Sequence, residues 1–137
     1  TIYDTFVVGP KEPTREAYHA ALEKRRTALQ AAYRNYFGAQ NVVAIAFPTT
    51  PLPARPIGQD TEVELNGKKV STLFTYLRNS RPASTAGTPG LSLPIGATVQ
   101  GLPVGLEFDA PSGEDRSLLR LGLAAERVFG TLPAPVL

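Results

Sequence analysis

The sequence predicts an α/β fold in which helices pack on a mixed β-sheet. Amphipathic patterns at 14–37 and 113–129 indicate two long helices, and three short apolar runs between them indicate strands. A length of 137 residues is sufficient for one domain that buries a core of its own. We therefore expect a single structural unit over 1–137.

The first long helix is expected over 14–37. Thr14 suits the N-cap position, because its hydroxyl can accept a hydrogen bond from a backbone N–H group of the first turn. Gly38 suits the position just after the helix. Between them, apolar and aromatic side chains recur at three-, four- and seven-residue spacing and form one stripe, which comprises Tyr18, Leu22, Leu29, Ala32, Tyr33 and Tyr36.

A strand is expected at 42–47, where every residue is apolar. Such a run is typical of a central strand that is buried on both faces of a sheet. Pro48 ends the strand, and three further prolines stiffen the loop 48–60. Because α/β sheets form their crevices at the carboxyl ends of central strands, this loop is a candidate pocket loop. An ordinary structural crossover explains the same pattern equally well.

The next elements are predicted from turn signals and periodicity. A hairpin is expected at 61–70 around Asn66-Gly67, a pair that favours a type I′ turn. Two short helices and two strands complete this part of the chain, at 71–77, 82–86, 91–95 and 104–108.

The last helix is expected over 113–129. Ser112 and Asp115 resemble a capping box at its start. A strand that is buried on both faces needs helices on both sides, and the sequence supplies only two long ones. This shortage indicates that some packing partners are missing. The stripe that should face the sheet consists of Leu118, Leu121, Ala125 and Val128.

The composition argues against several classes of function. A net charge of +2 without a basic stripe does not favour nucleic-acid binding. With no cysteine and one histidine, the chain lacks thiolate and histidine-rich metal sites, and we expect no metal and no cofactor. No apolar run reaches the roughly 18–20 residues that span a membrane, and the first residues do not resemble a secretory signal. We expect a cytoplasmic protein, and the start at Thr1 rather than Met suggests a longer parent.

No combination of side chains in the sequence is suited to nucleophilic catalysis. The one histidine, His19, falls on the polar side of the first helix, where a solvated histidine is expected. A lysine acts as a base only when burial lowers its pKa, and every lysine falls where solvent is expected. The lysines are Lys11, Lys24, Lys68 and Lys69.

A series of landmarks over roughly 14–130 carries a family resemblance. The landmarks are the helix with Tyr18, Arg25 or Arg26, Tyr33 and Phe37, the strand ending Phe47-Pro48-Thr49-Thr50-Pro51, the segments Pro82…Ala86-Gly87…Pro89-Gly90…Ser92-Leu93-Pro94…Gly96 and Gly101-Leu102-Pro103-Val104-Gly105, and Glu114-Asp115…Leu118-Leu119…Glu126. In this order they resemble the C-terminal part of the amidase signature family, serine hydrolases that cleave carboxamides. The segment from Arg78-Asn79 to Ala86-Gly87 resembles the branch that contains mandelamide and indoleacetamide hydrolases.

The resemblance implies the C-terminal portion of the amidase signature fold. It also implies a hydrolase that converts a primary carboxamide, such as the aromatic amide mandelamide, to an acid and ammonia. In that family a serine attacks the carbonyl, a second serine in a cis peptide relays the proton, and a lysine is the base. The segment with both serines and the upstream lysine are absent from this sequence, so no residue here inherits a catalytic role.

The resemblance implies that this chain forms walls of the substrate pocket. In related glutamine-specific amidotransferase subunits, an acidic residue commonly lies about five places before the residue that matches Pro82. Leu77 occupies that place and suits a substrate with an uncharged, aromatic side chain, although a core position also explains it. The candidate substrate contacts are Thr49, Thr50, Pro51, Ile57, Gly58 and Leu77.

The expected partner is a small-molecule amide, bound by the full-length enzyme, with no nucleic acid and no membrane. Surfaces meant for the missing N-terminal half should stay apolar and uncovered, so we expect this chain to self-associate and to be inactive alone. Two alternatives stay open. One is a stand-alone α/β binding module that uses the proline-rich loop, and the other is a decayed enzyme retained as a scaffold.

Overall fold

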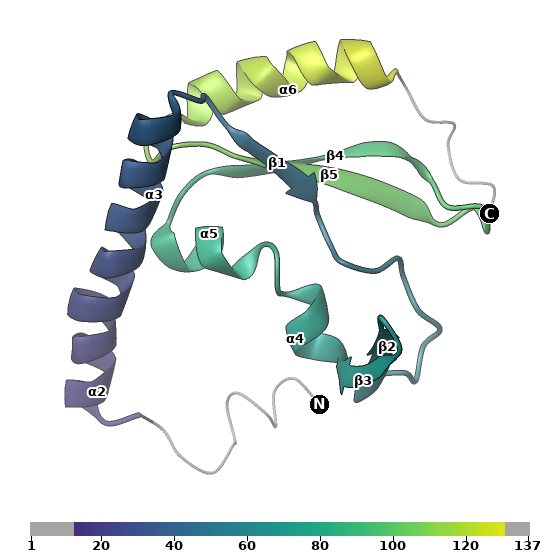
Figure 1. Ribbon diagram of the computed structural model, residues 1–137, viewed down its shortest axis with the longest axis horizontal. Coiled ribbons are helices and arrows are strands. Elements are labelled where there is room, and N and C mark those ends of the chain that lie inside the picture. The colour runs from purple at the N-terminus through teal and green to yellow at the C-terminus, as the bar shows by residue number, and fades with distance from the viewer. Residues whose placement is uncertain (1–12, 131–137) are drawn as a thin grey trace.

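The computed structural model describes residues 13–130, and its first element is one long helical rod (Figure 1). The predicted unit 1–137 also includes 1–12 and 131–137, which lie outside the described residues. The rod comprises α2 (Arg15–Ala20), the π-helical segment η1 (Ala21–Arg26) and α3 (Thr27–Gln40). Thr14 is its N-cap as predicted, and Thr14 Oγ1 accepts a hydrogen bond from the Ala17 backbone N–H at 3.2 Å.

The rod ends later than predicted. It runs through Gly38 to Gln40, and Asn41 then adopts a left-handed conformation with φ of 50°. Asparagine tolerates this conformation better than most residues because its short polar side chain can hydrogen-bond locally. Asn41 therefore provides the helix end that the sequence pattern assigned to Gly38.

Three antiparallel strands form the main sheet, and β5 lies between the other two. The α/β fold class with helices packed on a sheet is confirmed, but every strand pair among residues 13–130 is antiparallel, so the sheet is not mixed there as predicted. The strands predicted at 91–95 and 104–108 are present with wider bounds. In sheet order the strands are β1 (Ile45–Pro48), β5 (Pro103–Asp109) and β4 (Gly90–Ala97).

The run 42–47 does not form a central strand among the described residues. β1 begins at Ile45 and lies at an edge of the sheet, while the side chains of Val42 and Val43 are 39% and 71% exposed. An all-apolar run indicates apolar surroundings, but it does not distinguish a middle strand from an edge strand. The outer edge of β1 therefore carries backbone groups that pair with no other described strand, beside apolar side chains.

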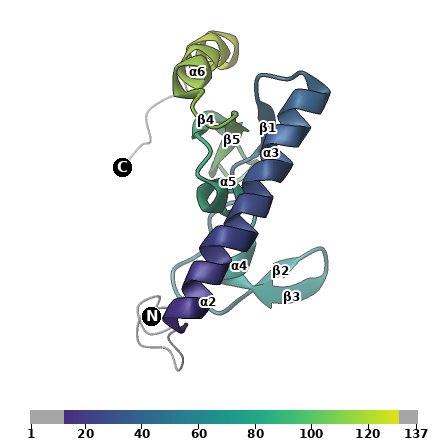
Figure 2. The ribbon, with the colours of Figure 1, turned by 90° about the vertical axis from the view of Figure 1, so that its left-hand side faces the viewer.

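One face of the sheet is covered by α6 (Asp115–Phe129), as Figures 1 and 2 show. Strand and helix side chains form the buried cluster between them, with Ala44, Leu91, Leu106 and Leu121 packed around it. This cluster is the hydrophobic core of the described residues. Its buried members are Leu93, Phe108, Ala110, Leu118 and Ala125.

The inward stripe of α6 is rotated relative to the prediction. Its buried positions are Leu118, Gly122 and Ala125, whereas Val128 is 80% exposed. The apolar pattern did not include Gly122 because glycine has no side chain and so adds nothing to a hydrophobic stripe. The absence of a side chain lets α6 approach β4, since a Cβ at Gly122 would collide with Leu91 Cδ2.

The start of α6 also differs from the prediction. Gly113 has a φ of 86°, so the chain turns there and the helix begins beyond it. Glu114 is the N-cap residue, and its Oε2 accepts a hydrogen bond from the Ser117 hydroxyl at 2.5 Å. The expected capping box of Ser112 and Asp115 is therefore wrong.

We expect the substitution Gly122→Ala to lower the free energy of unfolding by about 1 kcal/mol. Forcing a methyl group against Leu91 costs about 1–3 kcal/mol, and the better helix propensity of alanine returns at most about 1 kcal/mol. Gly38→Ala is the matched control, because nothing lies within 4 Å of a Cβ there, and it should stabilise by about 0.5–1 kcal/mol. Urea unfolding measures both. Equal stabilisation by the two substitutions would contradict the close approach of α6 to β4.

On the other side of the sheet lies α5 (Arg81–Ala86), with α4 (Thr72–Tyr76) beyond it, and α3 runs past one end of the sheet (Figures 1 and 2). Gln30 Nε2 on α3 donates to the Ala86 carbonyl oxygen at 2.8 Å and joins α3 to the end of α5. Within residues 13–130, every helix is too short or too polar to cross a bilayer.

A hairpin of β2 (Glu62–Leu65) and β3 (Lys68–Ser71) follows the proline-rich loop, as predicted. Asn66 and Gly67 have φ values of 53° and 75°, and a type I′ turn requires positive φ at both central residues. The hairpin lies beside α4, at the opposite end of the molecule from α6 (Figure 1).

Candidate functional site

The predicted pocket loop borders a shallow depression at the end of β1. Thr50 and Pro51, two of the predicted substrate contacts, lie in its wall. The depression has a volume of about 190 Å³. Its lining comes from the loop and from the start of β5, namely Pro48, Thr50, Pro51, Leu52, Pro53, Pro103, Val104 and Gly105.

Hydrogen bonds hold this loop from the neighbouring helices. Asn79 Nδ2 donates to the Pro48 carbonyl oxygen at 2.7 Å, and the Tyr76 hydroxyl donates to the Pro53 carbonyl oxygen at 2.6 Å. Inside the loop, Thr50 Oγ1 donates to the carbonyl oxygen of Leu52 at 2.8 Å. With φ fixed at each proline as well, the shape of the depression is set before any ligand binds.

Thr49 lies over the sheet and is not part of the wall of the depression. Its backbone N–H donates to the Gly105 carbonyl oxygen at 3.0 Å, and its hydroxyl is hydrogen-bonded to the Ser92 hydroxyl on β4. This bond passes over β5 at Gly105, where a Cβ would lie 2.7 Å from Thr49 Oγ1 and 2.9 Å from Ser92 Oγ. Thr49 thus ties the start of the pocket loop to both other strands.

The remaining predicted contacts lie apart from this depression. Ile57 is fully exposed, and Gly58 is an exposed residue with φ of 97°. Leu77 follows α4, where its N–H donates to the Leu73 carbonyl oxygen at 3.1 Å, and its side chain is 40% exposed. Leu77 is therefore not part of the core that the described residues form.

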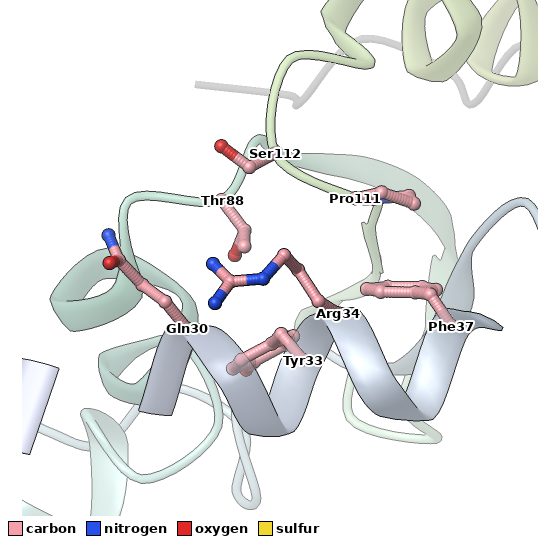
Figure 3. A pocket seen from close by; sticks show the side chains of 7 residues that line it. All are labelled: Gln30, Tyr33, Arg34, Phe37, Thr88, Pro111 and Ser112. Atoms are coloured by element: carbon pink, nitrogen blue, oxygen red, sulfur yellow. The ribbon is translucent and has the colours of Figure 1, made fainter. Parts of the chain in front are cut away.

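A second depression, which the sequence did not reveal, lies beside α3 (Figure 3). Figure 3 shows the Arg34 guanidinium extending between Gln30 and Thr88, with Phe37 and Pro111 at the other end. The volume is about 110 Å³, and like the first depression it is smaller than the roughly 300–1,000 Å³ of typical ligand pockets. The lining is drawn from three separate segments and comprises Gln30, Tyr33, Arg34, Phe37, Thr88, Pro111 and Ser112.

Two carboxyl groups are buried on the sheet face that α6 does not cover. Glu107 and Asp109 alternate with Phe108, which packs toward α6, and their side chains are 8% and 0% exposed. Burial, and then the charge of Glu107, raise the pKa of Asp109 to about 6. Burial also raises the pKa of Glu107. The pattern that could have revealed the pair is two acidic residues at alternate positions, one inside the strand predicted at 104–108 and one directly after it.

Tyr33 on α3 belongs to the same environment. Its pKa is raised first by its own burial and then by the charges of Asp109 and Glu107. Tyr33 therefore connects the acidic pair with the depression of Figure 3, whose wall it also forms.

Residues 13–130 place no buried lysine or histidine beside a serine. Lys24, Lys68 and Lys69 are exposed, and so is His19, so no lysine in this range is buried beside a serine. Over the same range, no group of three or more histidine, cysteine, aspartate or glutamate side chains could hold a metal ion.

Known proteins similar to this chain include two kinds of amide hydrolase. The Amidase family model matches residues 7–119. The chain is 52% identical over 112 residues to an indoleacetamide hydrolase of Agrobacterium vitis, covering 82% of this chain and 24% of that protein. It is 32% identical over 146 residues to a mandelamide hydrolase of Pseudomonas putida, covering 98% of this chain and 27% of that protein.

The structural comparison agrees with the sequence comparison. A crystal structure of an amidase is similar with a TM-score of 0.66 and 32% sequence identity, over 93% of this chain and 31% of that chain. The chain spans about a quarter of the length of the curated relatives that it matches. Because the family match includes most of the described elements and the predicted landmarks, the resemblance is confirmed, and the chain belongs to the amidase signature family.

Proposed function

We propose that the chain is the C-terminal part of a cytoplasmic amidase that hydrolyses an aromatic primary carboxamide to its acid and ammonia. The C–N bond breaks, and water supplies the new oxygen of the acid. The residues that perform these steps are a serine, a second serine in a cis peptide and a lysine, and all three lie outside this chain. The observation that supports the proposal most is the 52% identity to an indoleacetamide hydrolase, of which this chain matches 24%.

Substrate preference tests the proposed reaction. Ammonia release by the product of the complete gene should be measured with indoleacetamide, mandelamide and glutamine. We expect kcat/KM for an aromatic amide to exceed that for glutamine by about 100-fold, because an apolar pocket discriminates by the contact area that it buries. A preference for glutamine, or no release of ammonia from any of the three, would refute the proposal.

The described residues contribute pocket walls in this proposal. Thr50 and Pro51 already line a preformed depression, and Thr49 anchors the loop that carries them. Leu77, Ile57 and Gly58 are exposed. This exposure is expected if the other walls of the pocket come from parts of the enzyme outside this chain.

Leu77 offers a specificity test. In the complete gene product, Leu77→Asp should raise KM for an aromatic amide by roughly 10-fold, because a charge replaces an apolar contact. Leu77→Met is the control and should leave KM within about twofold, because it conserves volume and polarity. Steady-state kinetics measures both, and an unchanged KM in Leu77→Asp would remove Leu77 from the pocket.

We also propose that this chain, without the rest of the enzyme, is inactive and self-associates. Val43 beside the edge of β1 is 71% exposed, and Leu119 and Leu123 on the outer side of α6 are 59% and 61% exposed. Apolar surfaces next to an open strand edge favour association.

Sedimentation of the 137-residue chain tests the association. We expect a mass above that of a monomer, and a smaller mass for Val43→Lys, because a charge at the edge opposes strand pairing. Val99→Lys is the control, since Val99 is 99% exposed in the turn between β4 and β5 and should have no effect. A monomer at every concentration would contradict the proposal.

A further inference from the structure

The side chains of Glu107 and Asp109 converge on one small space. They lie two residues apart on β5 and point to the same face, opposite Ser92 and Gly90 of β4. Gly90 has no Cβ, and a Cβ built there would lie 3.0 Å from Asp109 Oδ1 and 3.3 Å from Glu107 Oε1. The two carboxyl groups therefore meet beside the backbone of Gly90.

Nothing in the described part of the chain satisfies the carboxyl group of Asp109. Both carboxyl oxygens of Asp109 are buried without a hydrogen-bond partner. Buried polar side chains are nearly always hydrogen-bonded, and a buried charge without a partner is costly. Within residues 13–130 the ion pair that forms joins Lys69 to Glu62 at the hairpin, remote from this space.

The nearby arginines are directed elsewhere. The Arg26 guanidinium lies over Gly87, where an added Cβ would be 2.9 Å from Arg26 Nη2. Arg34 extends along the second depression between Gln30 and Thr88 (Figure 3). The positive charge that would balance the two acidic groups is therefore not supplied by α3 or by η1.

A basic side chain is the occupant that fits best. A guanidinium or ammonium group can donate to two converging carboxylates at once, whereas a single shared proton leaves at least one Asp109 oxygen unpaired. β4 is the edge strand opposite β1, and Gly90 is exposed, so the space can be approached from that side. About three quarters of the length of the relatives lies outside this chain, which leaves ample polypeptide to supply the cation.

We propose that Glu107 and Asp109 form an anionic socket for a lysine or arginine side chain from the rest of the polypeptide. The ion pair joins the edge of this sheet to the remainder of the enzyme. The inference rests on the proposed function, because the basic side chain comes from the longer protein. The socket is a structural docking site, separate from the substrate walls around Thr50.

Thermal unfolding of the complete gene product tests the socket. Asp109→Asn should lower Tm by roughly 3–5 °C at about pH 8, because the incoming cation stays buried without its partner. Glu64→Gln is the matched control, since Glu64 is an exposed carboxylate on the hairpin and its loss should shift Tm by less than about 1 °C. An unchanged or higher Tm for Asp109→Asn would overturn the socket and favour a proton shared by the two acids.

A second measurement needs no variant. If Asp109→Asn fails to fold, carboxyl ¹³C shifts of the unmodified complete protein report the titration of Asp109 directly. A titration below the ordinary aspartate value of about 4 supports a cation in the socket, and one above about 5 overturns it.

Amide hydrolysis by the same preparations separates the two hypotheses. If the unmodified protein hydrolyses the amide and Asp109→Asn has an unchanged Tm, the socket is refuted and the proposed function stays intact. A complete gene product that binds a cation at Asp109 but hydrolyses no amide refutes the proposed function alone.

Discussion

Substitution of Gly105 by alanine is expected to lower the free energy of unfolding by about 2 kcal/mol. A Cβ at this position would lie 2.7 Å from Thr49 Oγ1, 2.9 Å from Ser92 Oγ and 3.3 Å from Thr49 Cβ. The Thr49 and Ser92 hydroxyls can move away from a new methyl group only by leaving the hydrogen bond that joins them. The cost of overpacking therefore outweighs the conformational entropy that alanine saves in a strand. Urea unfolding of the 137-residue chain measures the loss.

A double-mutant cycle identifies the cause of that loss. Thr49→Ala removes the hydroxyl that the new methyl group would meet, so Gly105→Ala should cost less in the Thr49→Ala background than in the unmodified chain. The start of the pocket loop would then depend on a glycine that leaves room for the Thr49–Ser92 hydrogen bond. Strict additivity of the two substitutions would contradict this explanation.

The stability of the 137-residue chain should fall as the pH rises from about 4 to about 6. Burial raises the pKa of Asp109 from 3.8 to about 6, so over this range the folded chain holds a proton that the unfolded chain has released. The stabilisation is complete below the unfolded pKa and is lost as the pH passes the folded pKa. At about 1.4 kcal/mol for each pH unit, the total is about 3 kcal/mol. The raised pKa of Glu107 adds to the same trend.

Asp109→Asn should remove most of this pH dependence, because asparagine cannot lose the proton. Asp60→Asn is the control, since Asp60 is exposed, and it should leave the dependence in place. Chemical unfolding at several pH values measures the slope for each protein. A stability that rises between pH 4 and 6 in the 137-residue chain would mean that a cation already pairs with Asp109 there.

Helical periodicity was sufficient to predict the long helices, and a turn signal was sufficient to predict the hairpin. The stripe from Tyr18 to Tyr36 repeats with the helical period, and Asn66-Gly67 has the residue types that positive φ favours. Such signals are local, because each depends on residues that are close in the chain. The end of the first helix differs from the prediction because Asn41, rather than Gly38, adopts the left-handed conformation that ends it.

The errors arose where tertiary contacts decide the outcome. An apolar run cannot show whether β1 lies in the middle or at the edge of a sheet, because both positions select apolar residues. Gly122 marks the closest approach of α6 to β4, yet glycine carries no hydrophobic signal. Recognition of the acidic pair required the register of β4 and β5, which places Gly90 opposite Asp109.

The candidate site was predictable in part for the same reason. A proline-rich loop after a strand is a local pattern, and it pointed to Thr50 and Pro51, which line the first depression. Their contact with a substrate stays a prediction. The second depression combines α3 with the segments after α5 and β5, and no sequence pattern joins those segments.

Ammonia release from indoleacetamide by the purified 137-residue chain, compared with an equal molar amount of the complete gene product, is the most direct test of where the reactive groups lie. We expect hydrolysis by the complete protein and none above the buffer rate by the 137-residue chain. A rate from the 137-residue chain that a serine-directed reagent abolishes would contradict the account.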